Sequence, residues 1–275
     1  PRMPRRILFI LVLAATIVAA CGGSPTAPAL TDPKDILLHA ASSLQTTRTV
    51  HLKVTLAGKL DTGLITGKPT GARVDLAGST LEGDVDIAGR EMKLSASVPA
   101  LLGLSGELLV DAGTVYVRTS LTGPKFQKLD PNAIFGGQPL PSLPPAASPD
   151  PSAVAAMIAT LKAQLDQLPA PVKLADEKIG DQDCYHVQAK VTSADVPQAS
   201  GVMGDLSGAM TIDVWTRKSD YRPARLVIAV DGGTSGTATI TVDLTGYDAA
   251  VTVDPPPADQ LSDQPFTIPS LPFLP

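Results

Sequence analysis

The two cysteines carry the most reactive side chains in the sequence, and their surroundings differ. Cys21 follows an uncharged apolar run over residues 7–20, and the basic pair Arg5 and Arg6 precedes that run. A basic head, a short apolar stretch and small residues before a cleavage point are the pattern of an export signal. Once Cys21 is used, Cys184 has no partner for an internal disulfide. We therefore expect Cys184 to be a buried and unreactive thiol.

The segment that ends in Val18-Ala19-Ala20-Cys21 resembles the lipobox of a bacterial lipoprotein signal peptide. The resemblance implies cleavage after residues 1–20, a diacylglyceryl group on the Cys21 thiol and an acyl chain such as palmitate on the new amino group. A transmembrane helix is the alternative, but the run has about 14 residues and a spanning helix needs about 20. The expected location is the extracytoplasmic side of the cell membrane, with the chain anchored through lipid on Cys21.

The other chemically active side chains form no recognisable catalytic or metal site. Three histidines are spread along the chain, at His39, His51 and His186. A zinc site needs several ligands at set spacings, which these residues do not provide. Asp84, Asp86 and Asp111 could be paired carboxylates for glycoside chemistry, but alternate acids are typical of the solvated face of a strand. No nucleophile elbow and no phosphate-binding glycine loop is present, so the sequence predicts no enzyme, cofactor or metal.

The composition favours an aliphatic, β-rich domain. The 275 residues are 44% hydrophobic but only 4% aromatic, and the length fits one large all-β domain or two small ones. Residues 1–20 hold three of the 22 basic side chains and none of the 27 acidic ones, so the processed chain is distinctly acidic. It has no basic run of the kind that binds nucleic acid. Small aliphatic side chains would line a smooth apolar cavity.

The order of elements follows from periodicity and from proline. Residues 21–30 have the composition of a flexible tether. The segment Thr31-Asp32-Pro33-Lys34-Asp35 predicts the start of a helix that ends near residues 45–47. Alternating apolar and polar residues then predict strands from Thr49 onward, and again from His186 to Leu244.

Two proline-rich segments interrupt this pattern. Residues 131–150 predict a long irregular loop, because seven prolines between 131 and 151 cannot all lie in a sheet. The apolar stripe that follows predicts a second helix, from Asp150 to Leu168. Residues 255–275 form a proline-rich but apolar tail, which we expect to extend over apolar surface.

Short segments along the processed chain resemble the LppX/LprG/LprA/LprF cell-envelope lipoproteins. They are the lipobox at Cys21, the helix pattern Leu38–Leu44, the strand Thr49–Leu56, the hairpin Gly113–Val117 and the strand-turn-strand segment Asp213–Leu226. The resemblance implies a half β-barrel of the LolA/LolB type, in which a large curved antiparallel sheet of about ten or eleven strands covers two helices. It also implies an apolar cavity that binds multi-acyl lipids or lipoglycans during their passage through the envelope.

We therefore predict a single, non-enzymatic lipid-binding domain over residues 31–254. Its ligand is an acylated lipid or glycolipid, with an envelope transporter as a possible partner and no nucleic acid. The apolar positions expected to line the cavity are Ile36, Leu37, Leu44, Leu52, Val54, Val85, Leu94, Val154, Met157, Ile158, Leu161, Ile212, Val214, Leu226 and Ile228. Two alternatives stay open. An envelope protein-interaction or sensor module would have a filled core, and a hydrolase of envelope polymers would have acids gathered in a cleft.

Overall fold

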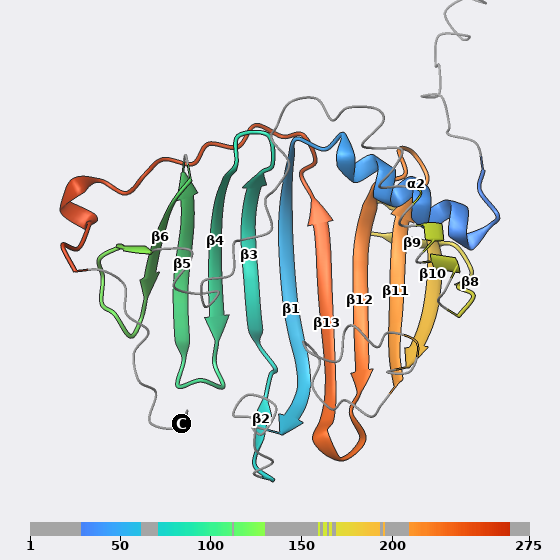
Figure 1. Cartoon of the computed structure of the whole chain (residues 1–275), viewed down its shortest axis with the longest axis horizontal. Helices are drawn as coiled ribbons and strands as arrows, with labels where there is room; N and C mark the ends of the chain where they lie inside the picture. The colour runs from blue at the N-terminus through green and yellow to red at the C-terminus, as the bar shows by residue number, and fades with distance from the viewer. Residues whose placement is uncertain are drawn as a thin grey trace, which may run out of the picture.

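The computed structural model describes most of the chain between residues 29 and 264. The described ranges are 29–61, 71–111, 113–129, 169–192 and 209–264, together with Ala159, Lys162, Ala163, Leu165, Asp166 and Asp195. Within them the chain forms one open antiparallel sheet of 13 strands, with a helix across one end (Figure 1). The prediction of a mainly β fold built on a large antiparallel sheet is confirmed. The lipobox and the 131–150 loop lie outside the described residues.

The elements have the following bounds in chain order: α2 (Pro33–Gln45), β1 (Thr49–Asp61), β2 (Arg73–Asp75), β3 (Ser79–Asp86), β4 (Glu91–Val98), β5 (Leu104–Asp111), β6 (Thr114–Thr119), β7 (Gln127–Leu129), β8 (Val172–Lys173), β9 (Glu177–Ile179), β10 (Gln182–Thr192), β11 (Ala209–Arg217), β12 (Pro223–Asp231), the 3-10 turn η2 (Gly233–Ser235), β13 (Gly236–Thr245) and the 3-10 turn η3 (Ala258–Gln260).

One long-range pair of strands joins the two halves of the sheet. The strand order is β7-β6-β5-β4-β3-β1-β13-β12-β11-β10-β8, with β2 added to β1 and β9 added to β10. The β1–β13 pairing extends from His51 opposite Thr245 to Leu60 opposite Gly236. The prediction of about ten or eleven strands was too low. The short strands β2, β8 and β9 have only two or three residues each, too few for alternation to reveal them.

The residues at the N-terminus of α2 explain where this helix begins. The Asp32 carboxylate accepts hydrogen bonds from the backbone N–H groups of Lys34 at 2.8 Å and Asp35 at 3.1 Å. These bonds satisfy N–H groups that have no partner within the helix, and Pro33 suits the first turn because its fixed φ is helical. The predicted helix start is confirmed, and the helix ends at Gln45 as expected.

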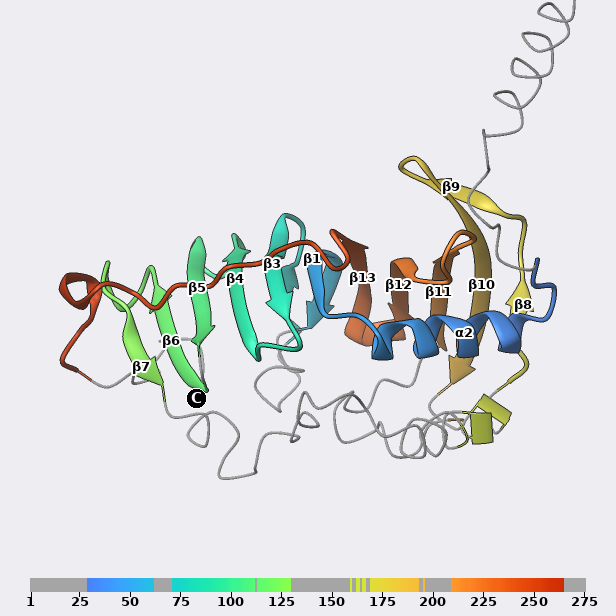
Figure 2. The ribbon, with the colours of Figure 1, turned by 90° about the horizontal axis from the view of Figure 1, so that it is seen from above.

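The prediction of two covering helices needs correction. The described ranges contain one helix with defined bounds, α2, which contacts β10 and β11 at one end of the sheet. Figure 2 shows that α2 lies on one side of the sheet and covers only the end that contains β10 and β11. Of the predicted second helix, five described residues are helical: Ala159, Lys162, Ala163, Leu165 and Asp166. An apolar stripe in the sequence indicates which face of a helix would be buried. It does not show whether a complete helix forms, because tertiary contacts supply most helical stability. No helix in the described ranges is long and apolar enough to cross a bilayer.

The chain after β13 runs along one edge of the sheet, from β13 to β7 (Figures 1 and 2). Val253 is buried against side chains of β5 and β6, and Leu261 forms a bridge with Phe126. Of the predicted tail, residues 255–264 are described, and Leu261 packs against the small apolar cluster at the β5–β7 end.

Two small clusters of buried apolar side chains lie at opposite ends of the sheet. The first contains Leu109, Tyr116, Phe126 and Val253. The second contains Ile36, Tyr185 and Val187 under α2. The long middle strands between the two clusters carry their apolar side chains on one face, and that face is the candidate site.

Candidate functional site: an apolar hollow on one face of the sheet

The strand register places apolar side chains side by side across the middle of the sheet. Because side chains alternate between faces, residues that are paired across strands share a face. One apolar row runs from β3 to β10: Leu81, Val54, Val242, Leu226, Val214 and Val187. The next row runs from β1 to β10: Leu56, Ile240, Ile228, Ile212 and Ala189. Neither row contains a polar side chain.

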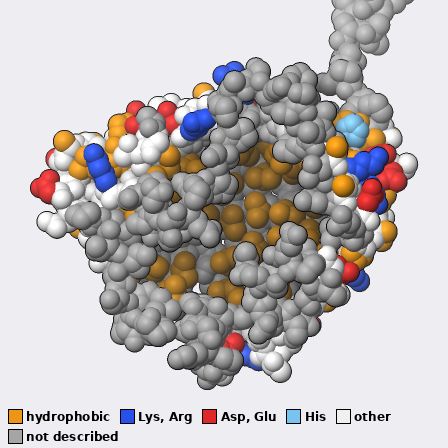
Figure 3. All heavy atoms as spheres, in the orientation of Figure 1, with side chains coloured by type: hydrophobic (Ala, Val, Ile, Leu, Met, Phe, Trp, Pro, Cys, Tyr) orange, Lys and Arg blue, Asp and Glu red, His pale blue; other side chains and the backbone are white. Residues whose placement is uncertain are grey.

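These rows are only partly covered. At the β10 end Val187 is 1% exposed, since α2 packs on it. Along the same row Val214, Leu226 and Val242 are half-buried. Figure 3 shows hydrophobic side chains gathered in a hollow over the middle of the sheet, where they are visible from outside. Among the described residues, no element covers the middle of the apolar face, although its side chains are those of a protein core.

The structure brings most of the predicted cavity residues to this face. Eight half-buried strand residues share it: Leu52, Val54, Val85, Leu94, Ile212, Val214, Leu226 and Ile228. Their contact with a ligand stays a prediction. On the helix, Ile36 is fully buried against Tyr185 and Val187, so it packs within the protein. Leu37 borders that cluster, and Leu44 is 40% exposed. Four predicted residues lie outside the described ranges: Val154, Met157, Ile158 and Leu161.

Sequence reasoning missed several residues of the same rows, among them Leu56, Leu81, Ile240 and Val242. Alternation was present in each strand and placed them on an apolar face. What was missing is the β1–β13 pairing, which joins residues almost 200 positions apart and puts Val242 beside Val54 and Ile240 beside Leu56. Leu81 lies beside Val54 through the shorter-range β1–β3 pairing.

The opposite face of the same strands is polar and largely pairs with itself. Lys53 Nζ lies 2.9 Å from Glu82 Oε2, Arg225 Nε lies 2.6 Å from Asp243 Oδ1, and Arg118 donates to Glu107 at 2.6 Å. The hydrogen bond from Lys53 lowers the pKa of Glu82 and raises that of Lys53. Predicted solvated acids lie here too, and the His51 ring contacts Asp84 at 2.8 Å.

His186 lies on this polar face but is nearly covered, with 8% of its side chain exposed. Its Nε2 lies 2.8 Å from Asp213 Oδ1, which also accepts a hydrogen bond from Gln188 at 2.9 Å. Its ring stacks on Trp215 at 4.2 Å, and the indole N–H donates to Glu177 at 3.0 Å. Among the described residues, no group of three or more His, Cys, Asp and Glu side chains is arranged to hold a metal ion. Cys184 is buried as predicted, and burial raises the pKa of its thiol.

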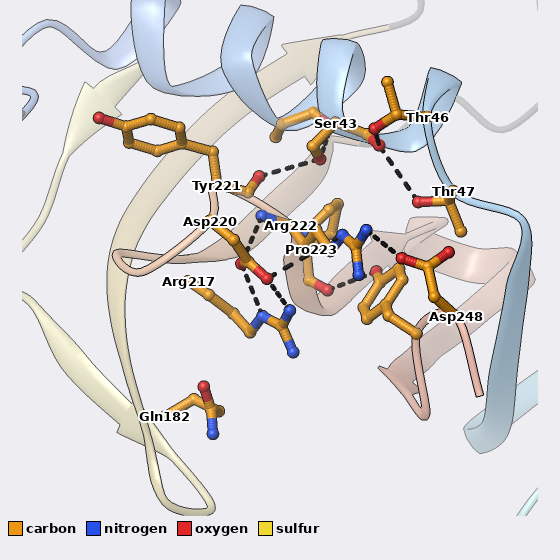
Figure 4. Close-up of polar contacts among 12 residues, drawn as sticks. Ser43, Thr46, Thr47, Gln182, Arg217, Asp220, Tyr221, Arg222, Pro223 and Asp248 are labelled. Atoms are coloured by element: carbon orange, nitrogen blue, oxygen red, sulfur yellow. Dashed lines mark hydrogen bonds and ion pairs between the residues drawn. The ribbon is translucent and has the colours of Figure 1, made fainter. Parts of the chain in front are cut away.

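A polar cluster fastens the end of α2 to the turn between β11 and β12 (Figure 4). The Ser43 hydroxyl donates to the Tyr221 carbonyl at 3.1 Å, and Arg217 and Arg222 both pair with Asp220. Tyr247 donates to a backbone carbonyl of β12 at 2.6 Å, and burial raises the pKa of its phenol.

An open pocket of about 440 Å³ lies beside this cluster. It is lined by His39, Ser42, Ser43, Thr46, Asp220, Tyr221 and Arg222. Its helix residues lie on the other flank of α2 from Leu37 and Leu44. We therefore treat the pocket as separate from the apolar hollow.

No protein-family model matches the sequence, and no curated protein sequence matches it. Two solved structures match the fold over most of the chain. LprF from Mycobacterium bovis aligns with a TM-score of 0.52 and 18% identity, over 82% of this chain and 96% of that one. The Mycobacterium tuberculosis lipoprotein LppX aligns with a TM-score of 0.50 and 13% identity, over 81% of this chain and 98% of that one. The predicted resemblance to LppX and LprF is therefore confirmed as structural similarity, and at these identities the shared property is the fold.

Proposed function

We propose that the protein binds acyl chains of a lipid or glycolipid in the apolar hollow and carries them within the cell envelope. The observation that carries the proposal is the half-buried middle of the apolar rows, where Val54, Leu226 and Val242 stand side by side without a covering element among the described residues. Exposed apolar surface of this extent is costly in water and marks a binding surface. Acyl chains match it because neither row offers a polar partner.

The energetics suit a carrier. Moving an acyl chain from water onto apolar protein surface gains roughly 0.8 kcal/mol per methylene. A chain that comes from a bilayer is already dry, so its transfer into the hollow is close to neutral. A hollow lined by small aliphatic side chains can therefore take up and release lipid without a tight, specific binding site.

We also propose that Cys21 carries the lipid anchor, with residues 21–30 as the tether and residues 31–254 as the binding domain. Two or more acyl chains give stable membrane attachment, whereas one gives only marginal binding. This arrangement places the hollow outside the cytoplasm and near its source of lipid. The two rows suit binding rather than chemistry, because their described residues from Leu81 to Val187 and from Leu56 to Ala189 have no polar side chain.

The proposal is tested by placing a bulky side chain in the hollow, on the apolar face of β12. We expect native mass spectrometry of the full chain to detect co-purified lipid, and a fluorescent fatty acid to bind after delipidation. Ile228→Trp should reduce probe affinity at least roughly fivefold, because the indole occupies the space of a few methylenes. Val227→Trp is the matched control, since this half-buried neighbour points to the opposite face. If both variants bind as the unsubstituted chain does, or no lipid is found, the proposal is wrong.

A further inference from the structure

One hydroxyl group in the floor of the apolar hollow is buried without a hydrogen bond. Ser79 begins β3 and pairs with Leu56 on β1, so it extends the second apolar row by one strand on the same face. Its side chain is 1% exposed, and its Oγ has no hydrogen-bond partner among the described residues. A buried polar group that is left unpaired is costly, and native structures rarely keep one without a reason. Ser79 therefore calls for an acceptor that the described chain does not supply.

The other buried and unpaired side-chain atoms of the described ranges lie outside the open middle of the sheet. They are Gln45 Nε2, Gln127 Oε1, His186 Nδ1 and Thr216 Oγ1. Gln45 ends α2, Gln127 lies on the last strand β7, and His186 lies on the polar face. Thr216 is 0% exposed and pairs with Tyr185, which packs under α2. Its hydroxyl therefore belongs to the closed end, and Ser79 is distinguished by its place in the floor of the hollow.

The floor of the hollow differs on the two sides of Ser79. Towards β11 the row continues with large aliphatic side chains: Leu56, Ile240, Ile228 and Ile212. This part crosses four strand spacings, or roughly 19 Å. Towards β5 the floor is lined by small residues, because Leu81 pairs with Ala96 and Ala96 pairs with Gly106. Ser79 therefore stands at the boundary between a long aliphatic floor and a part with more room above the strands.

We infer that the Ser79 hydroxyl donates a hydrogen bond to the carbonyl oxygen of an acyl ester. The acyl chain then lies across β1, β13, β12 and β11, and the esterified group lies over Ala96 and Gly106. A serine hydroxyl is a donor, and the ester carbonyl is the acceptor at the end of an esterified acyl chain. The flanking Leu56 and Leu81 are half-buried, so their side chains can turn aside as the ester approaches. The inference rests on the proposed lipid-binding function and adds to it a class of ligand and its orientation.

The test compares two fluorescent probes on the delipidated full chain. The methyl ester of parinaric acid carries an ester carbonyl, whereas diphenylhexatriene is a hydrocarbon without oxygen. Ser79→Ala should weaken binding of the ester about tenfold, because a hydrogen bond in apolar surroundings is lost, and should change hydrocarbon binding by less than about twofold. Its melting temperature should not fall, since the hydroxyl has no partner within the described chain. Thr216→Val is the matched control, because it removes a buried, unpaired hydroxyl from the closed end, and it should change neither affinity.

Infrared spectroscopy of the bound ester reports on the hydrogen bond itself. With an isotope-labelled ester carbonyl, the stretching frequency should be lower on the unsubstituted chain than on Ser79→Ala, because a hydrogen bond weakens the C=O bond. An unchanged ester affinity, equal losses for the two probes, or the same carbonyl frequency on both proteins would overturn the inference while the hollow remains a binding site. If the unsubstituted chain binds neither probe, the proposed lipid-binding function fails, and the role of Ser79 fails with it.

Discussion

The apolar face of the sheet has a closed end and an open middle, and both are built from the same kinds of side chain. Under α2, Ile36 and Val187 are 0% and 1% exposed, and Tyr185 completes the packing. Two strands away in the same row, Leu226 is half-buried, as is Val242 beside it. The difference shows that residue type does not decide whether an apolar row becomes core. The covering element decides, and the contacts of α2 with the strands are concentrated on β10 and β11.

The polar face of the middle strands differs from the apolar face in that its side chains pair with one another. Rows of ion pairs and hydrogen bonds cross it, from Arg118 with Glu107, through Lys53 with Glu82, to Arg225 with Asp243. Individual exposed pairs contribute little stability. The backbone ladder of the long strands contributes continuously, so the apolar face can remain open.

The largest effect should come from the closed end. Ile36→Ala should lower the free energy of unfolding by about 3 kcal/mol, because it empties a fully buried site between α2 and β10. Chemical denaturation of the full chain measures this change. Affinity for the fluorescent fatty acid should remain within about twofold of the unsubstituted chain, since Ile36 packs inside the protein. A loss of affinity without a loss of stability would place Ile36 in the hollow instead.

A smaller loss is expected on the polar face. Asp213→Ala should cost about 2 kcal/mol, because the nearly covered His186 ring and the Gln188 amide both lose their acceptor. Asp243→Ala is the control on the same face, where the pair with Arg225 is more exposed and should be worth less than about 1 kcal/mol. Equal losses in urea titrations would mean that burial of His186 adds nothing.

Local rules were enough for much of this architecture. The cap at Asp32 and the proline after it fixed where α2 starts, and alternation located the long strands. Alternation also placed Leu226 and Ile228 on an apolar face. These features depend on residues within a few positions of one another, which is the information that a single sequence contains.

Long-range pairing and the extent of covering could not be predicted in the same way. The β1–β13 pairing joins Leu52 to Leu244, and nothing local specifies it. Ile36 and Leu44 looked equivalent in the helical pattern, yet one is fully buried and the other is 40% exposed. Their difference depends on how α2 crosses β10 and β11. The left-handed backbone of Leu102 was likewise invisible, because the preference of leucine is against it.

The open middle should respond in the opposite way to the closed end. Ile228→Ala should lower the free energy of unfolding by only about 1 kcal/mol, since the side chain is half-buried and its loss leaves little enclosed cavity. Affinity for the fluorescent fatty acid should fall roughly threefold, which exceeds the change at Ile36. The ratio of stability loss to affinity loss, compared between Ile36→Ala and Ile228→Ala, tests the division into a closed end and an open middle directly. If Ile228→Ala costs as much stability as Ile36→Ala, the middle is a filled core and the carrier proposal fails.

The smallest effect should appear at the polar corner that holds the sheet near α2. The backbone N–H of Arg48 and the guanidinium of Arg222 hold the pKa of Asp248 below its ordinary 3.8. A carboxylate with a lowered folded pKa stabilises the protein above about pH 4 and loses that contribution as the pH falls through its folded value. Because Asp248 is well exposed, we expect its charge to contribute no more than about 0.5 kcal/mol to the free energy of unfolding.

Asp248→Asn keeps a residue suited to the left-handed φ of +58°, so the backbone should be undisturbed. The stability gap between the two proteins should therefore be widest near pH 7, narrow towards pH 2 and shrink in 1 M salt, where exposed charges are screened over about 3 Å. A gap that does not change with pH would show that the hydrogen bond to Arg48, rather than the charge, fastens this corner.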